Sequence, residues 1–220
     1  MSHAIAEHQH VGLMPDQWPE NEHFGKATAG KLGMWLFLLS DAFSFGGLLL
    51  AYGILRGGSD VWRQPSEPLL GINFTAGLTF LLICSSVTMV MAYAAVVEKN
   101  RTKAMKFLGL TSVGGGLFLC GQMQEYFGAF AFLFGHEGLV HEGLIFGQSH
   151  YATTFYVITS FHGLHVFSGV TYMTVMLVRT ALGKYDDGNY NHIELCGLFW
   201  HFVDLIWILV FTLVYLIPLD

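Results

Sequence analysis

The stretch that decides the fold is HYATTFYVITSFHGLHVFSGVTYMTVMLVR at residues 150–179, followed by the polar segment TALGKYDDGNYNHIEL and then by CGLFWHFVDLIWILVFTLVYLIPLD, ending at residue 220. Each apolar run is long enough to cross a bilayer, because a membrane helix needs about 20 residues. Both runs carry ionisable groups in their interiors: His162 and His165 in the first, His201 and Asp204 in the second. Such groups are costly in hydrocarbon, so we expect them to face protein or water.

Composition extends this interpretation to the whole chain. Of the 220 residues, 53% are hydrophobic and 12% are charged, whereas a soluble domain carries about 25% charged residues. The net charge of −6 and the lack of a basic stripe argue against nucleic-acid binding. We predict an all-α, polytopic membrane helix bundle with five transmembrane helices, following a polar N-terminal tail. The tail covers residues 1–30, and the membrane domain covers 31–220 with spans at 31–55, 70–97, 104–127, 152–179 and 194–217.

The distribution of lysine and arginine predicts the orientation of these spans. An odd number of spans places the termini on opposite sides of the membrane. Eight basic residues fall on the side of the N-terminus, and two, Arg56 and Arg63, fall on the other side. Because cytoplasmic loops carry the excess of basic residues, we expect a cytoplasmic N-terminus and an outer C-terminus.

The buried polar groups are expected to share one depth. Asp41 lies roughly 14 Å into the first span, counted at 1.5 Å per residue, and the same count places His162, His165, His201 and Asp204 near the membrane centre. Helical spacing places Glu194, His201 and Asp204 on one broad face of the last span. We therefore expect one polar face on each of the last two helices. We also expect Asp41 or Asp204 to pair with a histidine of the fourth helix.

Three functions for this layer are open from the residues alone. His162, His165 and His201 could bind a haem or a metal ion if they were aimed at one point. Acids and histidines arranged in series could form a proton path. The layer could also be a hydrogen-bonded set of side chains that fixes the packing of the helices.

Two other patterns have no assigned role. The N-terminal tail holds His3, His8, His10 and His23 without a recognised ligand spacing. The segments HEGL at 136–139 and HEGL at 141–144 form a tandem, which suggests the zinc motif H-E-x-x-H. His136 and His141 are five residues apart, however, and would not share a helix face. We expect an outer loop that contacts a neighbouring protein rather than a zinc site.

Several motifs in order resemble subunit III of the haem–copper respiratory oxidases. Gln122, Glu125 and Tyr126 come first, then Thr154-Phe-Tyr, Phe161-His-Gly-Leu-His165 and Arg179, and finally Glu194 and Trp200-His-Phe-Val-Asp204. Ser40-Asp41-Ala-Phe extends the resemblance to the first span, although the family usually has Glu where Asp41 stands. The seven-helix form of the family has two further helices at its start. The resemblance is to the five-helix bacterial form.

The resemblance implies a non-catalytic accessory subunit in the bacterial inner membrane, within a complex that reduces oxygen to water and pumps protons. Haem and copper would lie in partner subunits I and II, and this chain would have no catalytic or metal-binding residues. A small subunit IV is a further expected partner. The histidines would serve packing, Asp41 would influence proton supply, and Arg179 would bind the headgroup of a structural phospholipid.

Alternatives to this function differ in the electron donor or in the class of protein. Cytochrome c is the expected donor, and the runner-up is a quinol oxidase. The subunit III-like protein of nitric oxide reductases is a further relative. A stand-alone proton-coupled transporter would use Asp41, His162 and Asp204 as its ion path, but the chain shows none of the internal symmetry of inverted-repeat transporters.

Overall fold

The computed structural model describes residues 29–59, 62, 71–129, 138–185 and 191–217. In these residues the regular secondary structure is helical, with turns between the helices and no strand. Helices α1 (Ala29–Gly58), α3 (Ile72–Val97), α4 (Arg101–Phe127) and α6 (His150–Ala181) each cross the bundle once. The last crossing is α7 (Asn191–Val210), continued by the short π-helix η1 (Phe211–Leu216). Within these described residues, five helices are long and apolar enough to span a membrane, as the sequence predicts.

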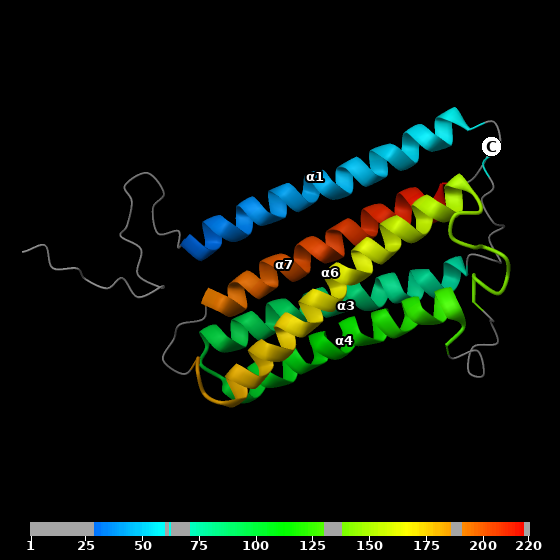
Figure 1. Ribbon diagram of the computed structural model, residues 1–220. Helices are drawn as coiled ribbons and strands as arrows, with labels where there is room; N and C mark the ends of the chain where they lie inside the picture. The colour runs from blue at the N-terminus through cyan, green and yellow to red at the C-terminus, as the bar shows by residue number, and fades with distance from the viewer. Residues whose placement is uncertain (1–28, 60–61, 63–70, 130–137, 186–190, 218–220) are drawn as a thin grey trace, which may run out of the picture.

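The helices run alternately up and down the bundle (Figure 1). The start of α1, the α3–α4 connection and the start of α7 lie at one end, and the end of α1 and the start of α6 lie at the other. Helices α3, α4, α6 and α7 pack together, while α1 packs mainly on α6 and α7. The predicted tail, residues 1–30, lies outside the described residues except for its last two positions.

Local capping explains where the helices end. The side chain of Ser149 accepts a hydrogen bond from the N–H of Ala152 at the start of α6. The side chain of Asn100 accepts one from the N–H of Lys103 at the start of α4. Gly128 follows α4 in the left-handed conformation, with φ of 64°, which glycine adopts without strain. Most helices extend two or three residues beyond the predicted spans, because hydropathy marks only the apolar part of a helix. Arg101 and Asn191, for example, are polar but helical.

Only a narrow seam of α1 is buried. Leu38, Asp41, Phe45 and Tyr52 are buried, and they recur at the three- and seven-residue spacing of a helix that packs through one seam. The rest of the helix exposes large apolar side chains, including Trp35 and Phe43, which suits a lipid environment. Gly46 and Gly47 do not mediate close contact with the other described helices, because a Cβ atom on either would meet nothing there within 4 Å.

Candidate functional site

The buried acid of α1 is paired with a histidine of α6. Nε2 of His165 lies 3.2 Å from Oδ1 of Asp41, and Nδ1 of the same ring lies 2.8 Å from the carbonyl oxygen of Phe161. A carbonyl can only accept, so Nδ1 carries a proton and donates it there. Nε2 of the same ring then faces the Asp41 carboxyl. The predicted pairing of an intramembrane acid with a histidine of the fourth span is confirmed for Asp41.

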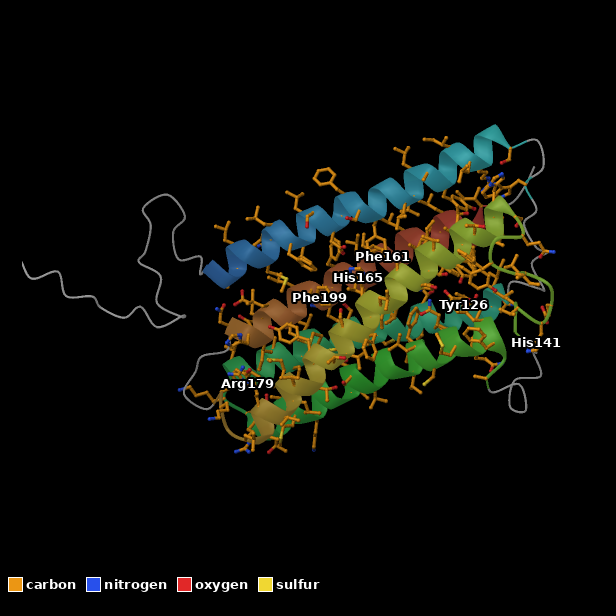
Figure 2. All side chains as sticks on the ribbon, viewed as in Figure 1. Tyr126, His141, Phe161, His165, Arg179 and Phe199 are labelled. Carbon is orange, nitrogen blue, oxygen red and sulfur yellow. The ribbon has the colours of Figure 1, made fainter. Side chains whose placement is uncertain are left out.

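Aromatic rings enclose this pair. The centroid of the His165 ring lies 5.2 Å from that of Phe45, 4.7 Å from that of Phe161 and 6.4 Å from that of Phe199. Figure 2 shows His165 near mid-length of the bundle, close to Phe161 of its own helix and to Phe199 of α7. The second oxygen of Asp41, Oδ2, has no hydrogen-bond partner within the described residues. The pair therefore joins α1 to the bundle through one polar contact in apolar surroundings.

His162 is fully buried and turns to a different partner. Its Nε2 lies 3.2 Å from the carbonyl oxygen of Val203, to which it donates. The ring packs against Trp207, at 4.6 Å between centroids, and against Phe118, at 5.7 Å. Nδ1 has no hydrogen-bond partner in the described part of the chain. His162 therefore links α6 to α7 by one hydrogen bond and by ring packing.

His201 and Asp204 face α3. Nδ1 of His201 lies 2.6 Å from the hydroxyl oxygen of Ser86. The Ser86 hydroxyl also lies beside the carboxyl of Asp204. Neither oxygen of that carboxyl makes a hydrogen bond within the usual distance and angle limits to a described residue. Glu194, by contrast, pairs with Lys31 of α1 at 2.7 Å. The residues of the polar face predicted for the last helix thus reach two neighbouring helices, α1 and α3.

Buried indoles form a second set of contacts with α3, which the sequence analysis missed. Nε1 of Trp200 donates to the hydroxyl of Ser85 at 3.1 Å, and Nε1 of Trp207 donates to that of Thr79 at 2.9 Å. A buried tryptophan usually finds an acceptor for its N–H. The hydroxyl residues of α3 were therefore the sequence feature from which these two hydrogen bonds could have been predicted. These bonds fix the position of α7 along α3.

The Gln122 and Tyr126 motif residues join α4 to α6. Nε2 of Gln122 donates to the carbonyl oxygen of Thr159 at 2.7 Å and to the hydroxyl of Tyr126 at 3.0 Å. The Tyr126 hydroxyl donates in turn to the hydroxyl of Thr159 at 2.5 Å. Gly163 leaves room for this network, because a Cβ atom there would lie 2.5 Å from Oε1 of Gln122. Two residues of α4 thus hold one turn of α6.

Arg179 lies in the last turn of α6, at the end of the bundle where α1 and α7 begin (Figure 2). Its guanidinium carbon lies 5.6 Å from the centre of the Tyr185 ring, a cation–π contact. Burial raises the pKa of the Tyr185 hydroxyl, and the positive charge of Arg179 acts in the opposite direction. The side chain is half-buried, so its stem packs on protein while its charged head stays near the end of the helix.

The described part of the HEGL tandem forms a turn on the end of α4. Gly138 and Gly143 have positive φ angles, and the leucine that follows each of them is buried. The N–H of Leu139 donates to the carbonyl oxygen of Glu125 at 2.8 Å and caps the helix. His136 and Glu137 lie outside the described residues. The repeated Gly-Leu thus has a role within this chain, whereas His141 is exposed at the end of the bundle (Figure 2).

The three central histidines do not converge in the arrangement that the structure describes. His165 contacts Asp41, His162 contacts Val203, and His201 contacts Ser86. Among the described residues, no group of three or more histidine, cysteine or acidic side chains could hold a metal ion. These side chains connect helices to one another.

Comparison with known proteins identifies the family. The family profile described as "Cytochrome c oxidase subunit III" matches residues 20–218. The chain is 34% identical to cytochrome c oxidase subunit 3 of Synechocystis sp. over 196 residues, covering 89% of this chain and 78% of that protein. It is 32% identical to the subunit 3 of Thermostichus vulcanus, covering 84% and 86%, respectively. It is also 28% identical to a cytochrome bo(3) ubiquinol oxidase subunit 3 of Pseudomonas putida, covering 84% of each. With its five membrane-spanning helices and these relatives, the chain belongs to the subunit III family of the haem–copper oxidases.

Proposed function

We propose that this chain is a non-catalytic accessory subunit of a proton-pumping terminal oxidase in a bacterial inner membrane. The observation that carries the proposal is that the polar groups within the spans contact other helices of the same chain. Asp41, His162 and His201 each contact a different helix of the same chain, and Lys31 and Glu194 form an ion pair between α1 and α7. These contacts stabilise a bundle, and a stable bundle is what a supporting subunit contributes to a catalytic neighbour.

In this proposal the partner subunits I and II hold the haem and copper, and a small subunit IV completes the complex. The chain packs on subunit I and protects its proton uptake during turnover. The Asp41–His165 pair supports this role because it sits where the loosely packed α1 meets α6. Breaking it would let α1 move relative to the rest of the bundle.

A phospholipid is the proposed ligand of this chain, bound near Arg179. The guanidinium can engage a phosphate group through two hydrogen bonds, and its place at the end of a membrane helix matches the depth of headgroups. The end of the bundle that carries Arg179 also carries Lys31, Lys99, Arg101, Lys103 and Lys106. The excess of basic residues supports the assignment of this end to the cytoplasm.

Cytochrome c is the proposed electron donor, since the relatives at 34% and 32% identity are cytochrome c oxidase subunits. The ubiquinol oxidase relative, at 28%, makes quinol the second candidate. The two donors are distinguished by adding reduced cytochrome c or a quinol to the purified complex and measuring the rate of oxygen consumption with each.

The whole proposal is tested by gentle affinity purification through a tag on this chain. We expect haem absorption in the eluate and, by mass spectrometry, the peptides of subunits I and II. A chain that elutes alone and takes up solute in vesicles when a proton gradient is applied would instead be a stand-alone transporter.

A further inference from the structure

Buried hydrogen-bonding groups gather at the end of the bundle where α1 ends and α6 begins. The hydroxyl of Tyr151 and the indole N–H of Trp62 have no hydrogen-bond partner among the described residues, whereas the hydroxyl of Tyr52 faces Arg56 and that of Tyr215 faces Glu125. The three tyrosines are 4%, 0% and 2% exposed, respectively. A buried polar group without a partner is destabilising, and such groups are rare in folded proteins. Two of them in one region therefore point to a bound ligand.

Ring contacts show that these side chains form one cluster. The centroids of Tyr52 and Trp62 are 5.3 Å apart, and those of Trp62 and Tyr151 are 5.8 Å apart. Phe155 connects Tyr151 to Tyr215, with centroid distances of 5.7 Å and 5.2 Å. Four separate segments of the chain thus contribute to the outer polar cluster, which we define as Tyr52, Trp62, Tyr151 and Tyr215.

An acid and a base flank the outer polar cluster. The buried carboxyl of Glu125 accepts a hydrogen bond from the hydroxyl of Thr75 at 3.2 Å and lies beside Tyr215. Arg56 donates to the carbonyl oxygen of Ile217 at 3.3 Å and lies beside Tyr52. Both Glu125 and Arg56 are within electrostatic range of Tyr151. The cluster therefore lies between a buried acid and a basic residue at the end of α1.

The chemistry of these groups selects the ligand. An anion is disfavoured by the carboxyl of Glu125. A metal ion is disfavoured because an indole N–H cannot be a ligand and the described residues hold no metal-binding group. Water both donates and accepts, and a buried water typically makes about three hydrogen bonds to such groups. Water can therefore satisfy phenols, indole and carboxyl together.

We propose that the outer polar cluster binds ordered water molecules, which connect the carboxyl of Glu125 to Arg56. The water gives Glu125 a route for exchanging protons with this end of the bundle. The site is distinct from the Asp41–His165 pair, since Tyr52 lies 11 residues, or roughly 16 Å, further along α1. The ring of Trp62, from the segment after α1, lies edge-on to those of Tyr52 and Tyr151, at interplanar angles of 81° and 86°.

Direct observation is the first test. In an electron cryomicroscopy map of the intact oxidase that resolves ordered water, we expect density within hydrogen-bond distance of the hydroxyls of Tyr151 and Tyr215. Absence of density there, in a map that shows water elsewhere in the protein interior, would overturn the proposal. Density for a lipid headgroup or another solute would overturn it as well.

The second test compares single hydroxyl deletions in the intact complex. Tyr151→Phe keeps the ring and removes the oxygen. If the Tyr151 hydroxyl binds water, the change lowers the temperature at which this chain dissociates from the complex. If the hydroxyl is dry, removing an unpaired polar group leaves that temperature unchanged or raises it, which would overturn the proposal.

Tyr156→Phe is the matched control for this series. Its hydroxyl donates to the carbonyl oxygen of Leu144 at 2.8 Å, so it has a partner within the chain. Removing this hydroxyl shows how far, and in which direction, the dissociation temperature changes when a hydrogen-bonded hydroxyl is lost. The proposal requires Tyr151→Phe to shift in the same direction as Tyr156→Phe.

Discussion

Oδ1 of Asp41 and Nε2 of His165 lie 3.2 Å apart, and their contact is the polar link between α1 and α6 at mid-length of both helices. Further links join α1 to α7 at its two ends. Lys31 pairs with Glu194, and Arg56 donates to the carbonyl oxygen of Ile217. The apolar seam of α1 is narrow, so these contacts carry an unusual share of its attachment.

Asp41→Ala is expected to speed the loss of oxidase activity during turnover while haem content stays unchanged. Removing one partner of a buried pair typically costs about 3–5 kcal/mol, because the other partner stays buried without it. We expect α1 to loosen and the rate of inactivation to rise several-fold. The measurement is oxygen consumption followed until it stops. Ser40→Ala is the control, since Ser40 is the exposed neighbour of Asp41; an inactivation rate equal to that control would refute the role of Asp41.

Arg179→Ala is expected to reduce the phospholipid that co-purifies with the complex. The change removes the bidentate donor, and Arg179→Lys should retain part of the lipid because it keeps the charge but loses the planar geometry. Lipid phosphorus per haem is the measurement. Lys184→Ala provides the control, an exposed cation near the same end of α6. Equal lipid retention in Arg179→Ala and Lys184→Ala would show that Arg179 is not the headgroup ligand.

Gly115→Ala is expected to destabilise the bundle, whereas Gly116→Ala is not. A Cβ atom at Gly115 would lie 2.6 Å from Cη2 of Trp200 and 2.6 Å from Cγ2 of Val170. Overpacking of this kind costs about 1–3 kcal/mol. At Gly116 a Cβ atom meets nothing within 4 Å, and alanine is the better helix former. The temperature at which the subunit dissociates in detergent measures both, and similar values for the two variants would contradict the packing of Trp200 against α4.

His162→Ala is expected to leave the ratio of iron and copper to protein unchanged. The imidazole donates to the Val203 carbonyl and packs on Trp207, so its loss should weaken the contact between α6 and α7. Elemental analysis of the purified complex gives the ratio. Loss of one equivalent of metal in this variant, with all subunits present, would mean that His162 is a ligand.

Sequence patterns predicted five spans because hydropathy is a local property of the chain. Five apolar runs bounded by Ser149, Asn100 and glycines such as Gly128 give five helices. Depth predicted that Asp41 or Asp204 pairs with a histidine of the fourth span, and the structure pairs Asp41 with His165. The helix ends were less predictable, because Arg101 and Asn191 are polar but continue the helical hydrogen bonding.

The partners of α7 could not be derived from the sequence. Glu194 and His201 are about 20° apart on an ideal helix, yet one reaches α1 and the other α3. The choice depends on the crossing of neighbouring helices, which residue spacing does not contain. The outer polar cluster was missed for a similar reason, because Tyr52, Trp62, Tyr151 and Tyr215 come from four distant segments.

The most direct measurement is metal analysis after this chain is selectively removed from the purified oxidase with detergent. We expect all haem and copper to remain with the other subunits and the isolated chain to contain neither. The depleted complex should start at the normal rate of oxygen reduction, inactivate faster during turnover, and recover its lifetime when the chain is added back. Iron or copper bound to the isolated chain, or a depleted complex as durable as the intact one, would contradict an accessory role.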